Sequence, residues 1–213
     1  MDFELSEEQR AIQDLAAGFA AKEMAPHAAK WDAECIFPRD VVQKAAELGF
    51  GGLYAQSEHG GSELSRLDAV LIFEQLSRAC PSTAAFISIH NMATWMVDSY
   101  GDADQRARFI PDLCSMQSIA SYCLTEPSSG SDAAALRTTA VLNGGDYVLN
   151  GTKAFISGGG RNDLYVSMVR TGGEGPDGVS WSVVPEDAEG CLLYTSDAAD
   201  ESARGGGGGG GGG

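Results

Sequence analysis

The segment YCLTEPSSGSD, residues 122–132, gathers an aromatic ring, a thiol, hydroxyls and a carboxylate at the end of an apolar run. Residues 119–125 read as a strand, whose backbone groups can pair with the edge of a planar heterocycle that alternates donors and acceptors, as a flavin does. Thr125 adds a hydroxyl, and the turn at 127–131 can direct amides and hydroxyls at phosphate oxygens. The residues alone leave two interpretations open: a cofactor edge of this kind, or an ordinary serine-rich surface turn.

The other candidate motifs favour neither a dinucleotide site nor a metal site. The GGG triplet at 158–160 follows strand-like residues but opens no helix, so it reads as a hairpin turn and not as a dinucleotide fingerprint. The three histidines, His27, His59 and His90, lie far apart without metal-ligand spacing. We therefore expect no metal site, and a packed or surface role for His90, which falls within a predicted helix.

Composition excludes several classes of protein. The 213 residues are enough for one or two domains with a sizeable core. The formal net charge of −16 argues against nucleic acid as a partner, because phosphates attract Lys and Arg. No apolar run is long enough for a membrane span, and residues 1–10 do not resemble a secretory signal. The five cysteines include no C-x-x-C pair, so they predict neither a metal nor a disulfide framework and fit a reducing compartment.

Helical periodicity dominates the first half of the chain. Ser6 with Gln9, and again Ser65 with Asp68, have the spacing of a capping box at a helix start. Apolar residues at helical spacing follow each pair, and proline or glycine marks the helix ends. The predicted helices occupy residues 6–26, 39–48, 65–81, 82–100 and 102–109, the last of them stopping at Pro111.

Strand patterns take over after the helices. Asn143-Gly144-Gly145 is a tight-turn signal between two strand-like segments, and Asn150-Gly151 is a second one. Helices followed by strands predict an α+β protein, with an α-helical domain at residues 1–117 and an incomplete β domain at 118–190. The predicted strands occupy residues 119–125, 138–142, 147–149, 153–157, 163–170 and 179–184.

The last segment, residues 191–213, reads CLLYTSDAADESAR followed by nine glycines. CLLYTS is a natural translation of TGTCTCTTATACACATCT, which resembles a transposase-type sequencing adapter, and DAADE continues the match. A run of G bases would encode the glycines. We expect this tail to be artefactual, with a flexible linker or an expression scar as the alternative.

YCLTEPSSGSD and KAFISGGG, residues 153–160, together resemble the flavin-binding signature of the acyl-CoA dehydrogenases. The resemblance extends over residues 5–186, and its one departure in the first motif is Ser128, where the family pattern has glycine. It implies an all-α N-terminal domain, a β-barrel-like middle domain, and a C-terminal helical domain that this chain lacks. Stretches such as KAAELGFGGLY and STAAFISIHNM favour the branch of the family that oxidises isobutyryl-CoA in valine breakdown.

The resemblance implies FAD as the cofactor and assigns its contacts. Thr125 would lie near the reactive edge of the flavin ring, and Ser131 would also contact the acyl-CoA substrate. A second strand carrying Phe155, Ile156 and Ser157 would complete the wall of the flavin site. The implied flavin contacts are Tyr122, Cys123, Leu124, Thr125, Gly130, Ser131, Phe155, Ile156 and Ser157.

The implied reaction is the α,β-dehydrogenation of a thioester, in which a glutamate removes the Cα proton while hydride leaves Cβ for the flavin. By the resemblance, that glutamate lies in the C-terminal domain, so Glu126 is not the base and no catalytic residue is expected within this chain. The chain by itself is therefore expected to be inactive. The implied partners are an electron-transferring flavoprotein and identical subunits in a homotetramer.

Three alternatives stay open beside this interpretation. One is another short- or branched-chain acyl-CoA dehydrogenase, or a flavin oxidase of the same fold. The second is a non-catalytic flavin-fold protein, and the third is a helical-plus-β binding module in which the signature is a coincidence. With no visible targeting segment, we expect a bacterial cytoplasm, with the mitochondrial matrix as the alternative.

Overall fold

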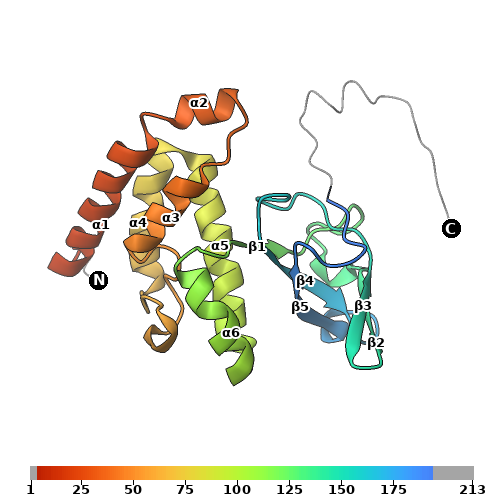
Figure 1. Ribbon diagram of the computed structural model, residues 1–213. Coiled ribbons are helices and arrows are strands. Elements are labelled where there is room, and N and C mark those ends of the chain that lie inside the picture. The colour runs from red at the N-terminus through yellow and green to blue at the C-terminus, as the bar shows by residue number, and fades with distance from the viewer. Residues whose placement is uncertain (1–3, 194–213) are drawn as a thin grey trace.

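The computed structural model describes residues 4–193, with helices gathered on one side and a β-sheet on the other (Figure 1). The order of helices first and strands second confirms the predicted α+β arrangement. The helices are α1 (Glu7–Phe19) with its π-helical continuation (Ala20–Met24), α2 (Ala28–Ala33), α3 (Arg39–Glu47), α4 (Arg66–Ala79), α5 (Pro81–Tyr100) and α6 (Ala103–Cys114).

Capping boxes begin three of these helices. Ser6 and Gln9 exchange side-chain and backbone hydrogen bonds at the start of α1, and Ser65 and Asp68 do so at the start of α4, as predicted. A third box begins α6, where the Asp102 carboxylate accepts from the backbone of Gln105. Each box satisfies amide groups that the first helical turn would otherwise leave without a partner.

Helix α6 is longer than predicted, because it continues through Pro111 to Cys114. A proline inside a helix removes one hydrogen bond and costs about 3 kcal/mol. Ile110, Leu113 and Cys114, which surround the proline, are all buried, and their packing holds the helix together. The prediction that the helix stops at Pro111 was therefore wrong, since tertiary packing outweighs the local preference.

Within the described residues the sheet has five strands: β1 (Ala120–Cys123), β2 (Thr139–Asn143), β3 (Asp146–Asn150), β4 (Leu164–Arg170) and β5 (Val179–Pro185). Strand β4 is central, because it pairs with β1 and β2 in parallel and with β5 in antiparallel orientation. Strands β2 and β3 form the predicted hairpin around Gly144 and Gly145, with Asn143 opposite Asp146. The sheet is therefore mixed, and β1 lies against β4 with Ala120 opposite Leu164.

Two predictions about the segment after β3 were wrong. Residues 153–157 form no strand, because Phe155 has a left-handed φ of 57°, which interrupts an extended run. Asn150-Gly151 makes no second hairpin, and the chain simply leaves β3 there. The glycines at 158–160 do lie in a turn and open no helix, although no strand precedes them.

Helix α5 joins the helical part to the sheet. It contacts β1 and β4, and its residues Ala93, Met96 and Val97 share one buried cluster with Ala120 and Val166 of the sheet. A second cluster fills the space among α1, α3, α4 and the first half of α5. Within the described residues, no helix is long and apolar enough to cross a membrane.

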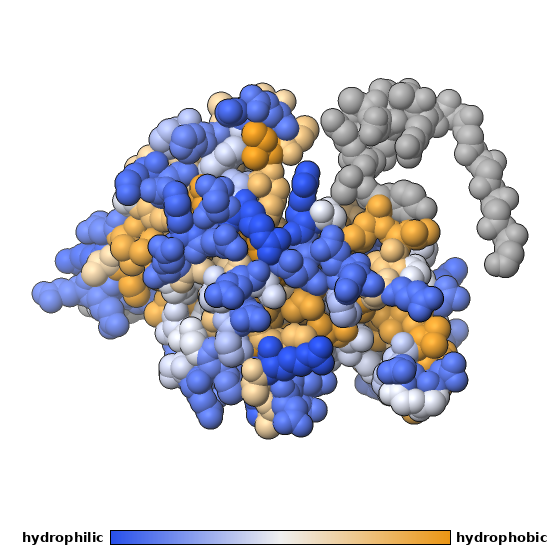
Figure 2. Space-filling model, in the orientation of Figure 1, coloured by the Kyte–Doolittle hydropathy of each residue, from blue (hydrophilic) through white to orange (hydrophobic). Residues whose placement is uncertain are grey.

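Some apolar side chains lie on the surface. On α4, Leu67 and Val70 are half exposed, although both belong to the apolar pattern of the predicted helix. Figure 2 shows hydrophobic surface at the sheet end of the molecule, where the β2–β3 hairpin exposes Val141, Leu142, Tyr147 and Val148. The predicted artefactual tail lies outside the described residues from 194 onward.

Candidate functional site

Two segments far apart in sequence meet at the end of β1. The backbone amide of Ala154 donates to the carbonyl of Thr125 at 2.9 Å. The ammonium of Lys153 donates to the carbonyl of Leu124 at 3.0 Å. These bonds place Phe155 directly beside the end of the strand that carries Tyr122. The structure thus brings together the two motifs that the sequence singled out.

Glu126 anchors this meeting point. Its carboxylate is buried and accepts from the Lys153 ammonium at 2.8 Å, from the Arg137 amide at 2.6 Å and from the Thr138 amide at 2.9 Å. Its own amide and carbonyl pair with those of Ser129 at 3.0 Å, which closes the turn that follows. One side chain therefore fixes the end of β1, the turn and the return segment.

Burial alone would raise the pKa of Glu126, but hydrogen bonds from Lys153, Thr138 and Arg137 outweigh it and lower the pKa to about 2. The carboxylate is therefore ionised at neutral pH and held by three hydrogen bonds. A general base needs a pKa near the working pH and a free lone pair aimed at a substrate proton. The exclusion of Glu126 as the base stays a prediction, for which its low pKa and its three hydrogen bonds are arguments.

The turn after Glu126 exposes hydroxyl groups. Ser129 is buried and its hydroxyl donates to the carbonyl of Asp132 at 2.6 Å, which holds the turn from inside. Ser128, Gly130 and Ser131 are exposed. Within residues 4–193, the hydroxyls of Thr125, Ser128 and Ser131 have no hydrogen-bond partner. The turn therefore presents donors and acceptors that the protein leaves uncommitted.

Phe155 is the most unusual residue of the return segment. Its side chain is 94% exposed, and its left-handed backbone is strained for a bulky residue. Ile156 is half-buried and Ser157 is exposed. An aromatic ring held out next to Thr125 forms one face of a surface that an aromatic ligand could cover.

The predicted contact residues on β1 differ in what they expose. Tyr122 is half-buried, whereas Cys123 is buried at 3% exposure. Burial raises the pKa of the Cys123 thiol to about 11, so this thiol stays protonated and is a poor nucleophile at neutral pH. Only the backbone of Cys123 is available to a ligand. Within the described residues no cluster of three or more histidine, cysteine or acidic side chains could hold a metal ion.

Two buried polar residues behind the site, Ser121 and Asn162, were not predicted from the sequence. The Ser121 hydroxyl donates to the carbonyl of Ser157, and the Asn162 amide nitrogen donates to the same carbonyl at 3.0 Å and to the Ser121 hydroxyl. The other amide atom, Asn162 Oδ1, is buried without a partner within the described residues. A signal for Ser121 was present in the sequence: it is a polar residue within an otherwise apolar strand.

A largely apolar cavity of about 420 Å³ lies beside Tyr122, between α5 and the sheet. Aromatic and thioether side chains make up its wall, so it can accept an apolar group. Its lining comprises Met92, Trp95, Met96, Tyr100, Tyr122, Met168 and Trp181.

Comparison with known protein families decides the class of this chain. The model of the acyl-CoA dehydrogenase N-terminal domain matches residues 6–117, and that of the acyl-CoA dehydrogenase middle domain matches residues 121–205. The chain belongs to the acyl-CoA dehydrogenase family. The two family domains meet where α6 gives way to β1, and the resemblance inferred from the two motifs is confirmed.

Individual relatives are similar over most of this acyl-CoA dehydrogenase chain. It is 57% identical over 186 residues to isobutyryl-CoA dehydrogenase of Bos taurus and 56% identical over 187 residues to that of Dictyostelium discoideum, both named as mitochondrial. Each match covers 87% of this chain and 45% of the relative, so the chain spans about half the length of these relatives. A solved structure described as the FAD complex of PigA is 28% identical, with a TM-score of 0.84, over 89% of this chain and 51% of that one.

Proposed function

We propose that the chain is the flavin-binding N-terminal half of an FAD-dependent acyl-CoA dehydrogenase that oxidises a short branched-chain acyl-CoA, isobutyryl-CoA. The observation that carries the proposal is the joined edge made by residues 122–126 and 153–157. Lys153 and Glu126 tie its two segments together, and both belong to motifs of the family. The 57% identity to the bovine isobutyryl-CoA dehydrogenase supports the choice of substrate.

The residues present fit FAD. The hydroxyls of Thr125 and Ser131 are uncommitted within the described residues, and Ser131 lies on the exposed turn. The exposed ring of Phe155 suits the face of a planar heterocycle, because aromatic rings stack favourably. A Cβ on Gly130 would meet no atom within 4 Å, so a ligand can approach the backbone there. We propose the flavin contacts Tyr122, Cys123, Leu124, Thr125, Gly130, Ser131, Phe155, Ile156 and Ser157, with Ser131 also contacting the substrate.

FAD, when bound, supplies the hydride acceptor for the thioester's Cβ. The described residues would bind the cofactor and fix its orientation. Glu126 is ionised and paired with Lys153, so it keeps the two segments of the edge together and takes no proton from a substrate. The base is proposed to be a glutamate in the part of the relatives' length that this chain does not span. On this proposal the chain alone binds no substrate productively and is inactive.

The remaining features of the proposal concern organisation and partners. We propose a helical domain at residues 1–117, a middle domain at 118–190, and an artefactual tail from 191 onward. An electron-transferring flavoprotein is the proposed acceptor of electrons, and a homotetramer the proposed assembly. All five cysteines are free, which suits a reducing compartment such as a bacterial cytoplasm or a mitochondrial matrix.

The first experiment is a long sequencing read of the source DNA across the codon for Gly190. The expected result is a frame that continues into a helical domain, and a frame that ends in CLLYTSDAADESAR and glycines would refute the adapter interpretation.

The protein expressed from the source gene should be yellow and should reduce an artificial acceptor with isobutyryl-CoA faster than with butyryl-CoA. A yellow protein that prefers another acyl-CoA would overturn only the substrate, and one that reduces oxygen instead would be an oxidase of the same fold.

A further inference from the structure

The segment between α6 and β1, residues 115–119, carries the chain from the helical part into the sheet. Met116 and Ile119 are fully buried there, and Met116 adopts a left-handed φ of 52°. Buried backbone groups need hydrogen-bond partners, and an irregular segment cannot supply them to itself. Backbone groups of α6 and of residues 163 and 164 satisfy part of the segment. Side chains satisfy the rest: Gln43 and Arg39 of α3 donate to the carbonyls of Met116 and Gln117, and Asp163 accepts from the amide of Ile119.

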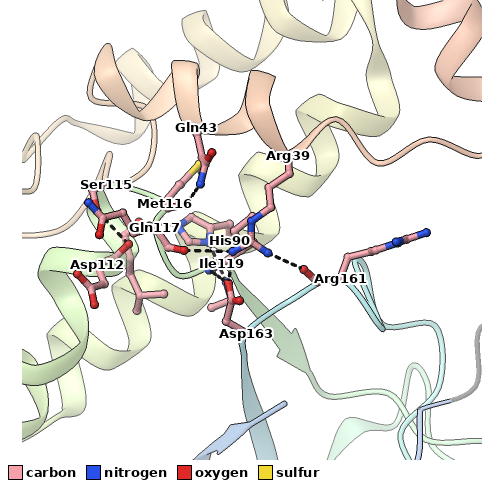
Figure 3. Close-up of polar contacts among 12 residues, drawn as sticks. Arg39, Gln43, His90, Asp112, Ser115, Met116, Gln117, Ile119, Arg161 and Asp163 are labelled. Carbon is pink, nitrogen blue, oxygen red and sulfur yellow. Dashed lines mark hydrogen bonds and ion pairs between the residues drawn. The ribbon is translucent and has the colours of Figure 1, made fainter. Parts of the chain in front are cut away.

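Arg39 of α3 and Asp163 hold the outer side of this junction (Figure 3). The Arg39 guanidinium donates to the carbonyl of Gln117 at 3.1 Å, to the carbonyl of Arg161 at 3.3 Å and to the Asp163 carboxylate at 2.6 Å. The same carboxylate accepts from the amide of Ile119 at 2.7 Å. One ion pair therefore joins the entry to β1 with the turn that leads into β4.

His90 of α5 holds the inner side. Its Nδ1 accepts from the amide of Ala120, the first residue of β1, at 3.0 Å, and its Nε2 lies 2.9 Å from the carbonyl of Leu113 in α6. An amide can only donate and a carbonyl can only accept. These two partners therefore require a neutral ring with its proton on Nε2. The ring is fully buried, and it joins α5, the end of α6 and the start of β1 through one tautomer.

The amide of Ala120 lies two residues before Tyr122 and next to Ser121, whose hydroxyl donates to the carbonyl of Ser157. A shift of β1 along its axis therefore displaces both segments of the proposed flavin edge. The four register pairs with β4, and the bonds of Ile119 to Asp163 and Leu164, fix β1 relative to β4 but not relative to α5.

We propose that His90 is a positioning residue for the flavin edge: its bond to the Ala120 amide sets the place of β1, and thereby of residues 122–125 and Ser157, relative to α5. This inference rests on the proposed function, because it concerns the surface that would receive FAD. The hydrogen bond between His90 and the Ala120 amide then fixes β1 relative to α5, in addition to the apolar packing between them.

Two substitutions separate the two bonds of His90. In His90→Asn the side-chain oxygen can stand where Nδ1 stands and accept from Ala120, while the bond to Leu113 is lost. In His90→Gln the side-chain nitrogen can stand where Nε2 stands and donate to Leu113, while the bond to Ala120 is lost. Both remove the ring, so both should lower stability to a similar degree.

Asn91→Ala is the matched control, since Asn91 is equally buried on α5 but bonds only to Phe50, Leu53 and Ile87.

The measurement is the FAD dissociation constant of the protein expressed from the source gene, with urea unfolding and amide hydrogen exchange at residues 120–125 recorded in parallel. We expect His90→Gln to weaken FAD binding about tenfold and to speed exchange at Ala120, because a buried amide has lost its acceptor. His90→Asn and Asn91→Ala should stay within about threefold of the unmodified protein.

Equal FAD affinity for His90→Asn and His90→Gln, with the unmodified protein binding FAD tightly, would overturn the positioning role while leaving the proposed function intact. A loss of affinity that merely follows the loss of stability across all three variants would overturn it too. If the unmodified protein binds no FAD, the proposed function fails, and this inference fails with it.

Discussion

Lys153 and Glu126 form the most buried ion pair among the residues that the structure describes. Their atoms lie 2.8 Å apart, with side-chain exposures of 12% and 4%. The pair joins the end of β1 to the return segment, and the same ammonium also donates to the carbonyl of Leu124. Breaking it removes one of the restraints that hold Phe155 beside Thr125, next to the bond from the Ala154 amide to the Thr125 carbonyl. The pair therefore connects the stability of the fold to the shape of the site.

Replacement of Lys153 by methionine should be strongly destabilising. It leaves the Glu126 carboxylate buried on two backbone amides without a counter-charge. Removal of one partner of a buried pair costs about 3 kcal/mol or more, whereas exposed pairs contribute less than about 1 kcal/mol. Urea unfolding at neutral pH measures the difference.

Lys22→Met is the matched control, because Lys22 pairs with Glu23 at 3.1 Å but is 82% exposed. Its loss should change the free energy of unfolding by less than about 1 kcal/mol. Equal effects of the two substitutions would show that the Lys153–Glu126 pair is no more than a surface contact.

The order of helices followed by strands, and most of the helices, could be predicted where local chemistry decides, but α2 was not predicted. Capping pairs such as Ser6 with Gln9, and the two glycines of the β2–β3 turn, act over a few residues and leave a readable pattern. Pro111 was misjudged because the packing of Ile110 and Leu113 keeps α6 helical around it, and packing partners are distant in sequence.

The two motifs of the site could be predicted from the sequence, but the contacts between their residues could not. Family resemblance placed YCLTEP and KAFIS together, yet nothing in their spacing shows that Lys153 bonds to Glu126 or that Phe155 is strained and exposed. In the sequence, His90 is one of several polar residues in a largely apolar helix, and nothing distinguishes it from the others. Its two backbone partners, Leu113 and Ala120, belong to other elements, so only the tertiary structure reveals what it holds.

Protonation of His90 should make the protein less stable as the pH falls from about 6.5 to about 4. Burial lowers the pKa of His90 from 6.5 to about 4. Between these values the unfolded chain binds a proton that the folded protein excludes, so stability falls as pH decreases from 6.5 towards 4, by up to about 1.4 kcal/mol per pH unit. The groups that contact the ring are uncharged: the backbone at Gly51, Leu113 and Ala120 and the Thr94 hydroxyl.

Urea unfolding at several pH values, with and without His90→Asn, tests this window. The variant carries no titrating ring, so its stability should vary less between pH 6.5 and 4.5. Glu126 acts in a separate range, because its pKa is lowered from 4.5 to about 2 and the stability it contributes is lost only as pH falls through that interval. Parallel curves for the two proteins above pH 4.5 would contradict the assignment to His90.

Gly158 should not tolerate a side chain. Its φ is +73°, and an added Cβ would lie 2.6 Å from both Asn162 Oδ1 and Phe86 Cε2. Gly158→Ala should therefore cost about 1–3 kcal/mol in unfolding free energy, from backbone strain and overpacking. Gly145→Ala is the control, since no atom lies within 4 Å of its added Cβ, and its urea midpoint should change little. An unchanged midpoint for Gly158→Ala would mean that the 157–161 turn adapts freely.

Phe155 should matter to FAD and not to folding. Its ring is 94% exposed, so Phe155→Ala removes almost no packing and should leave the urea midpoint of the FAD-free protein unchanged. If the ring stacks on the flavin, its loss should weaken FAD binding about tenfold, which corresponds to about 1.4 kcal/mol. Flavin fluorescence titration measures this. Tyr147→Ala is the control, because Tyr147 is an exposed aromatic residue on β3 and should have no effect. Equal weakening by both substitutions, or none by Phe155→Ala, would remove Phe155 from the proposed flavin wall.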